Sequence, residues 1–151
     1  MGTLLGEYLT VKNENQPTNK AVMNHKEYDL QKQVCKYLEL QYPNVLFLSD
    51  TIANVKLNVM QGARNKAIQK QGFKCPDLII LQPNYYHAGL LIELKIDSPY
   101  KRNGELKKNE HLEGQSKSIE QLKSLGYHAT FSVGFEQTIQ IIDEYMLHVL
   151  K

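Results

Sequence analysis

The stretch "CPDLIILQPNYYHAGLLIELK", residues 75–95, decides the fold of this chain. It holds two short aliphatic runs on either side of a connection rich in proline, asparagine and tyrosine, a pattern typical of a β-hairpin. If Asp77 stands opposite Glu93, every aliphatic residue of one arm meets an aliphatic residue or a glycine of the other. We therefore predict a hairpin in this register, centred on Tyr85, with residues 82–88 as the connection.

The same register gathers charged groups at the open end of the hairpin. Directly opposed residues on paired strands have Cβ atoms roughly 5 Å apart, so Asp77 and Glu93 would lie side by side. Lys95 is two residues beyond Glu93 and shares its face of the strand, because side chains alternate with a period of two. Ile92 and Leu94 take the opposite face, where they can pack into a core.

Two adjacent carboxylates repel each other unless a positive charge compensates them. Mg²⁺ does this with oxygen ligands, typically one or two carboxylates together with waters and phosphate oxygens. Such an ion polarises a phosphoryl oxygen, while the Lys95 ammonium can orient an attacking water and offset developing negative charge. The pattern favours metal-assisted hydrolysis of a phosphodiester. The alternative is a surface ion-pair cluster on an edge hairpin.

The rest of the chain predicts alternating helices and strands. Apolar residues spaced by three and four predict a helix that is capped by Asn24, with Glu27 in the capping-box position, and that stops before Pro43. Further elements are predicted over 45–50 (strand), 58–72 (helix ended by Gly72), 115–125 (helix followed by Gly126), 128–134 (strand) and 135–150 (helix). Residues 97–114 read as a polar connector. The order predicts an α/β fold with a mixed central β-sheet flanked by helices.

Length and composition indicate one globular domain. The chain has 151 residues, of which 42% are hydrophobic and 23% charged, enough for one core. Residues 1–23 are polar and predict an N-terminal extension or tail, so the domain is expected over residues 24–151. No apolar run approaches the ~20 residues of a membrane span, and the start does not resemble a secretory signal. We therefore expect no membrane partner.

Charge, cysteine usage and the absence of certain motifs narrow the expected partners, compartment and cofactors. The formal net charge is +2, which permits a nucleic-acid partner without demanding one. Cys35 and Cys75 cannot form a disulfide framework, and two lone thiols fit a reducing cytosol. The histidines and cysteines lack the spacing of a zinc site. There is no glycine-rich phosphate loop, so we expect no ATP-driven activity.

The "PD" of Pro76–Asp77, followed after the hairpin by "ELK" at residues 93–95, resembles the active-site pattern of PD-(D/E)XK nucleases. Further blocks resemble one branch, the VRR-NUC (virus-type replication-repair nuclease) domain, in the family's order: "EYDLQKQVCKYLELQYPNVLF" (27–47), "GFKCPDLIIL" (72–81), "GLLIELK" (89–95) and "HLEGQSKSIEQLKSLGYHATFSVGF" (111–135). The resemblance runs from about residue 25 to the C-terminus and implies a restriction-endonuclease-like α/β/α core. Cys75 departs from the small residue or glycine that often precedes "PD" in the family.

The resemblance also implies roles for individual residues. The implied ligands of Mg²⁺ or Mn²⁺ are Asp77, Glu93, the backbone carbonyl of Leu94 and, from the first helix, Glu27. Lys95 would position the attacking water, and Gln115 would hold the site or touch the substrate. Two plainer alternatives stay open, because Glu27 could be only a helix-capping residue and Gln115 an ordinary residue of its helix.

Six further cations are candidates for contact with DNA phosphates. They are Lys66, Lys70, Lys101, Arg102, Lys107 and Lys108. The first two lie on the helix leading to Asp77, and the other four follow Lys95 directly. The alternative is that these side chains are simply solvated, because lysine-rich loops are common.

Together these expectations describe a Mg²⁺-dependent DNA endonuclease. The chain looks most like the small stand-alone VRR-NUC proteins of phages and prophages. That likeness implies action on DNA in the cytoplasm of a bacterial host, pairing as homodimers, and selectivity for junctions or branched DNA in phage replication, recombination or repair. One alternative is a non-catalytic nucleic-acid-binding module on a nuclease-like fold. Another is an interaction protein in which the hairpin charges form a metal-independent ion pair.

Overall fold

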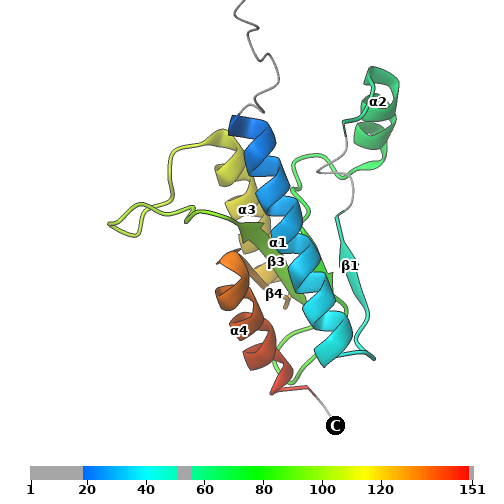
Figure 1. The fold of residues 1–151 in the computed structure, drawn as a ribbon, viewed down its shortest axis with the longest axis vertical. Helices are drawn as coiled ribbons and strands as arrows, with labels where there is room; N and C mark the ends of the chain where they lie inside the picture. The colour runs from blue at the N-terminus through cyan, green and yellow to red at the C-terminus, as the bar shows by residue number, and fades with distance from the viewer. Residues whose placement is uncertain (1–18, 51–55, 150–151) are drawn as a thin grey trace, which may run out of the picture.

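The computed structural model describes residues 19–50 and 56–149 and shows helices packed on both faces of a sheet (Figure 1). The helices are α1 (Asn19–Gln41), α2 (Val59–Ile68), α3 (Glu110–Ser124) and α4 (Gly134–Met146), and the strands are β1 (Phe47–Ser49), β2 (Leu78–Ile80), β3 (Leu90–Lys95) and β4 (His128–Val133). The predicted order of elements is confirmed.

The described strands form one mixed sheet in the order β1-β2-β3-β4. The pairs β1–β2 and β2–β3 are antiparallel, and β3–β4 is parallel. A parallel pair needs a crossover connection, and α3 supplies it between β3 and β4. The predicted fold class, a mixed sheet flanked by helices, is confirmed.

The hairpin has the predicted register. Leu78 pairs with Ile92 and Ile80 with Leu90, so the next position of the ladder sets Asp77 opposite Glu93. The alternation of β3 also follows the prediction: Ile92 and Leu94 belong to one core, whereas Leu91, on the face of Glu93, belongs to another. The register therefore determines which side chains face each layer of helices.

The two cores lie on opposite faces of the sheet. The larger core packs α1 and α4 against the sheet and contains Leu30, Val34, Leu38, Leu78, Ile80, Leu90, Ile92, Leu94, Ile142 and Tyr145. The smaller core lies under α3 and contains Leu91, Ile119, Leu122, Ala129 and Phe131. Polar bonds join the helices of the first layer, since the hydroxyls of Tyr37 and Tyr42 each donate to Asp143 Oδ1 at 2.7 Å. α1 is thereby held against α4 and carries Glu27 at a set position.

The start of α1 differs from the prediction. The helix begins at Asn19, so Asn24 is an interior residue and the expected capping box with Glu27 is wrong. Neither proline nor glycine occurs between Pro17 and Glu27, so nothing in the sequence stops the helix from extending backwards. Residues 1–18 lie outside the described residues, and the N-terminal extension predicted over residues 1–23 stays a prediction.

Two other helix boundaries also shift. α2 ends at Ile68, four residues before Gly72, which instead forms a later turn with φ of 73°. α3 begins at Glu110, inside the stretch expected to be a connector, because the Asn109 side chain caps it by accepting bonds from the backbone N–H groups of His111 and Leu112. The connector between β3 and α3 is therefore shorter than predicted. Among residues 19–50 and 56–149, no helix combines the length and apolarity that crossing a bilayer requires.

We predict that Ile92→Ala strongly destabilises the protein. Ile92 is fully buried at the centre of the hairpin, and truncation of such a residue costs about 2–5 kcal/mol in unfolding free energy. The matched control is Leu48→Ala in β1, where the side chain is 57% exposed and the cost should be below about 0.5 kcal/mol. Urea denaturation of both variants checks this, and equal losses would contradict the packing described.

Candidate active site

A cavity of about 690 Å³ opens at the end of the hairpin where β2 begins and β3 ends. It is lined by Glu27, Gln31, Asp50, Gln69, Phe73, Lys74, Cys75, Asp77, Glu93, Leu94, Lys95, His111 and Gln115. The list includes every residue that the sequence marks as catalytic or as a metal ligand. Segments far apart in the chain therefore meet here: α1, the segment after α2, both strands of the hairpin, and α3.

Asp77 is fixed between the strand ends. Its Oδ2 accepts a hydrogen bond from the backbone N–H of Leu94 at 2.9 Å, which lays the carboxylate against β3. Its backbone carbonyl accepts from the N–H of Asp50 at 2.8 Å, so the end of β1 is tied to the same point. One backbone bond thus orients the carboxylate of Asp77, and a second fixes its main chain.

Glu93 is buried, with 4% of its surface exposed, and two side chains hold one of its oxygens. Oε1 accepts from the Lys95 ammonium at 3.1 Å and from the Gln115 amide of α3. The Lys95 ammonium also lies 6.0 Å from the ring centroid of Phe131. The predicted trio of Asp77, Glu93 and Lys95 is therefore gathered in one place, with Gln115 as a fourth member.

Burial makes the acid pair difficult to ionise. Burial raises the pKa of Glu93, the charge of Asp77 raises it further, and Lys95 only partly opposes this, so that the pKa is about 8. Burial likewise raises the pKa of Asp77, against the lowering effects of the Leu94 N–H donor and the Lys95 charge. One lysine is thus insufficient to keep both acids ionised at neutral pH.

The donor set fits a hard divalent cation. Among the described residues no three His, Cys, Asp or Glu side chains form a group able to hold a metal ion. The two acids that the hairpin register sets side by side are Asp77 and Glu93. Two carboxylates suit Mg²⁺, which keeps several waters. Gln115 Oε1 is buried and finds no hydrogen-bond partner among the described residues, a sign of an incomplete polar site. Glu27 lines the cavity, and its role as a ligand stays a prediction.

Five polar residues of the cavity were not predicted from the sequence: Gln31, Asp50, Gln69, Lys74 and His111. Gln31 lies one helical turn after Glu27, and His111 one turn before Gln115, so the i,i+4 spacing could have indicated both. The Gln31 amide donates to Ser49 Oγ at 2.6 Å and to the backbone carbonyl of Asp50 at 2.8 Å. It thereby joins α1 to the end of β1.

Lys74 is a second cation at the cavity. Its backbone N–H donates to Ser118 Oγ at 2.7 Å, and its side-chain carbons lie 3.5 Å from where a Cβ at Gly114 would stand. The lysine stem therefore runs along α3 over a glycine. Its neighbour Cys75 also lines the cavity and is exposed, yet partial desolvation, followed by the charges of Asp50, Glu93 and Asp77, raises the pKa of its thiol. The departure at Cys75 thus places a neutral thiol beside the acids.

The comparisons with known proteins bear on the fold. No protein-family model and no curated protein matches this sequence. A solved structure described as a "VRR_NUC domain protein" matches over 82% of this chain and 89% of its own, with a TM-score of 0.54 and 22% sequence identity. This chain has a VRR_NUC-like fold. At that level of identity the likeness establishes the architecture and leaves the chemistry to be argued from the residues.

The VRR_NUC-like fold does not bring the six predicted DNA-contacting cations into the cavity. None of them is among the lining residues that the structure describes. Lys66 lies in the last turn of α2 and Lys70 just beyond it, and the other four lie in the loop 97–109. That loop is pinned by a bridge between Tyr100 and Leu106, and near its tip Lys101 pairs with Glu105 at 3.0 Å. All six are exposed, and their contact with DNA stays a prediction.

We predict that Glu93→Gln stabilises the metal-free protein at alkaline pH. A carboxyl group whose pKa is raised on folding stabilises the folded state below the pKa that it has in the unfolded chain. That stabilisation is lost as the pH rises through its pKa in the folded state, which for Glu93 is about 8. The variant should therefore exceed the wild type by roughly 2–4 kcal/mol in unfolding free energy near pH 9. The difference should vanish near pH 5. Denaturation in EDTA across pH measures it, and a pH-independent difference would contradict the buried acid pair.

Proposed function

We propose that this protein is a Mg²⁺-dependent DNA endonuclease. The observation that carries the proposal is the meeting of Asp77, Glu93 and Lys95 in one cavity, where a half-buried and a buried acid share one ammonium. Such a pair is costly unless a further cation compensates its negative charge. The VRR_NUC-like fold supports the reaction class, because the comparison protein is named for a nuclease domain.

Asp77, Glu93 and the Leu94 carbonyl would hold Mg²⁺ or Mn²⁺, with Glu27 supporting from α1. When bound, the ion would supply the Lewis acid that phosphodiester hydrolysis needs. The bond from the Leu94 N–H to Asp77 Oδ2 orients the Asp77 carboxylate before any cation arrives, so this ligand would need little reorganisation.

The remaining side chains prepare the reacting atoms. Lys95, held 3.1 Å from Glu93 Oε1, would orient the attacking water and balance negative charge that develops on the phosphoryl oxygens. Gln115 donates to the same Glu93 oxygen and so fixes the rotamer of the acid. Lys74 is the second cation available to a substrate phosphate at this cavity.

The resemblance to VRR-NUC proteins also suggests the family, origin and DNA substrate of this protein. We infer membership of that family, a phage or prophage origin, and action on DNA in the bacterial cytoplasm. Two copies would pair, and branched or junction DNA would be cut during replication, recombination or repair. Phosphate contacts would dominate affinity, so binding would weaken as salt increases.

We predict that Asp77→Ala and Lys95→Ala each lower Mg²⁺-dependent cleavage by roughly hundredfold or more, because each removes a group at the reacting centre. The assay is nicking of supercoiled plasmid and cutting of a four-way junction, with EDTA as the metal-free arm. The matched control is Lys36→Ala in α1, which removes an exposed lysine that does not line the cavity and should retain most activity.

Cleavage that persists in EDTA or in both site variants would refute the proposal. Binding of DNA by the wild type without any cleavage under Mg²⁺ or Mn²⁺ would favour a non-catalytic binding module instead.

A further inference from the structure

Helix α2 stands away from the body of the protein (Figure 1). None of its ten residues, all of which are described, is buried. Val59 is 93% exposed and Ile68 is 84% exposed. A helix inside one domain normally buries an apolar face against the core, so α2 lacks the packing that usually stabilises such a helix.

α2 is also poorly stabilised on its own. It contains Gly62, and no described atom lies within 4 Å of a Cβ built at that position. Glycine inside an exposed helix costs about 1 kcal/mol relative to alanine, and isolated helices of this length are marginal in water. What supports α2 is a capping box, in which Asn58 and Gln61 exchange side-chain and backbone hydrogen bonds. A bound partner would supply the stability that packing does not.

The charge of this part of the chain is one-sided. Between Asp50 and Asp77 the sequence has no acidic residue, yet it carries five cations, Lys56, Arg64, Lys66, Lys70 and Lys74. The whole chain has 18 Lys and Arg against 16 Asp and Glu, so outside this segment acids outnumber cations by 16 to 13. The positive net charge of the protein is thus concentrated around α2, and its partner should be an anion.

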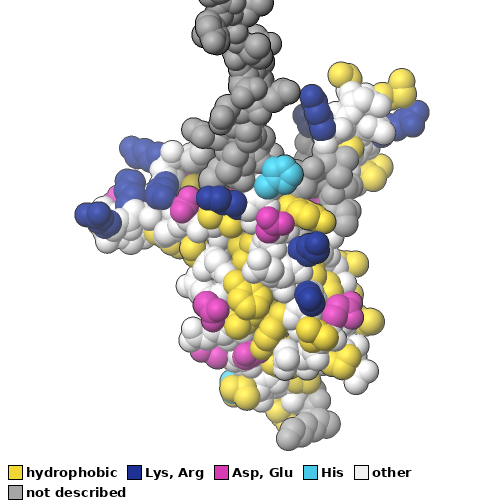
Figure 2. Space-filling view, in the orientation of Figure 1, with side chains coloured by type: hydrophobic (Ala, Val, Ile, Leu, Met, Phe, Trp, Pro, Cys, Tyr) yellow, Lys and Arg dark blue, Asp and Glu magenta, His cyan; other side chains and the backbone are white. Residues whose placement is uncertain are grey.

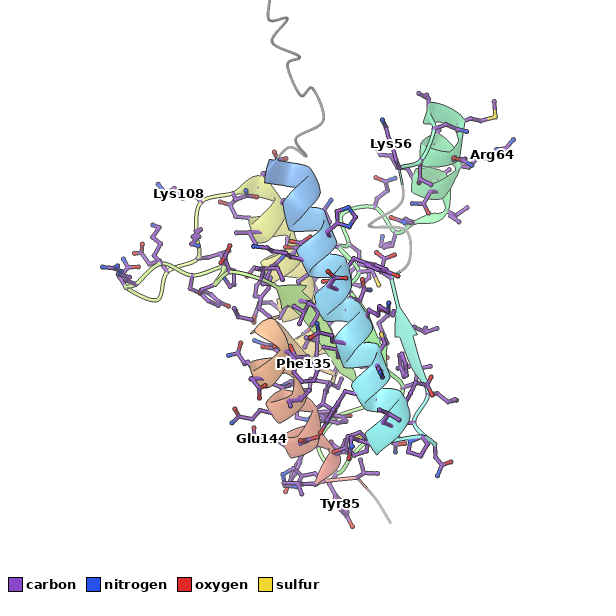
Figure 3. The ribbon with its side chains drawn as sticks, viewed as in Figure 1. Lys56, Arg64, Tyr85, Lys108, Phe135 and Glu144 are labelled. Atoms are coloured by element: carbon purple, nitrogen blue, oxygen red, sulfur yellow. The ribbon has the colours of Figure 1, made fainter. Side chains whose placement is uncertain are left out.

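The segment also lies at the cavity. Gln69, Phe73 and Lys74, which follow α2, line the cavity beside the acid pair. Lys56 and Arg64 project from the α2 region on one side of the molecule, and Lys108 projects from the loop 97–109 on the other (Figure 3). Dark blue cationic side chains accordingly flank the end of the molecule that carries the N-terminal part of α1 (Figure 2).

We propose that α2 is a docking helix for duplex DNA, placed so that a bound duplex presents its backbone to the cavity. This inference rests on the proposed function, since DNA is the polymer to be cut. A ten-residue helix is about 15 Å long, and the major groove of duplex DNA admits an α-helix. α2 contains no aromatic residue on which unpaired bases could stack, which favours a duplex over a single strand.

A second copy of this chain fits α2 less well. The exposed Val59, Met60 and Ile68 could contact another protein. A symmetric pair, however, would bring the same patch of each copy together. Arg64 and Lys66 of one copy would then face Arg64 and Lys66 of the other, with no acid in the segment to offset them.

The first test measures binding of a short fluorescent duplex by anisotropy in EDTA, where no metal-dependent cutting occurs. Arg64→Gln/Lys66→Gln should weaken binding by roughly tenfold and flatten the slope of log affinity against log salt by about 1 per lost phosphate contact. The matched control, Lys36→Gln/Lys123→Gln, removes two exposed cations from α1 and α3 and should bind nearly as the wild type does.

The second test changes the helix without changing charge. Gly62→Ala meets no neighbour and should raise the population of helical α2, so that duplex binding tightens by about threefold to fivefold. A single-stranded probe of the same length should bind more weakly than the duplex, and the variants should affect it less.

Equal losses for the α2 and control double variants would overturn the proposal, as would a Gly62→Ala variant that gains helicity without gaining affinity. A second result would also overturn the proposal. If sedimentation shows dimers that Met60→Glu dissociates, and the α2 double variant binds DNA as the wild type does, then α2 contacts a second copy of the chain. Binding through α2 without cleavage under Mg²⁺ would refute the proposed nuclease activity while supporting this inference. Cleavage under Mg²⁺ together with DNA binding that does not depend on α2 would support the nuclease activity and refute this inference.

Discussion

The antiparallel pairing of β2 with β3 in one register is the constraint on which the site depends. Leu78 opposite Ile92 places Asp77 opposite Glu93 and lets the Leu94 N–H donate to Asp77 Oδ2. A slip of one residue would exchange the two faces of a strand, exposing its core residues and separating the acids. Because the hairpin is covered on both faces by helices, such a slip would disrupt two cores at once. Packing energy therefore maintains the geometry of the charged groups.

The site illustrates how function opposes stability within this fold. A buried glutamate whose pKa is raised to about 8 by burial and by Asp77 makes folding less favourable as pH rises. Lys95 and Gln115 reduce the cost by hydrogen bonding to Glu93, yet Gln115 keeps one buried oxygen without a partner among the described residues. Unsatisfied polar groups and raised carboxyl pKa values of this kind are expected where a ligand completes a site. α2 shows a similar feature at larger scale, a cationic helix without a partner of its own.

Local pattern allowed the hairpin, its register and the acid pair to be predicted, because alternation within residues 77–95 specifies all three. Gln115 and Glu27 came from resemblance, and both line the cavity. Gln31 was missed although it follows Glu27 by one helical turn. Lys74 was not predicted, because its placement depends on a bond to Ser118, a partner 44 residues away. The start of α1 was misjudged because Asn24 looks like a cap in a stretch without breakers. Lys66 and Lys101 were expected to contact DNA, but sequence cannot show that both stand outside the cavity.

The most direct test of the account is anomalous diffraction from crystals of the wild-type protein soaked in Mn²⁺. The account predicts one strong peak between the carboxylates of Asp77 and Glu93, within coordination distance of the Leu94 carbonyl, and no such peak in crystals of Glu93→Gln. Wild-type crystals without density at this pair, or with manganese bound only elsewhere, would contradict the claim that the buried acids form a cation site.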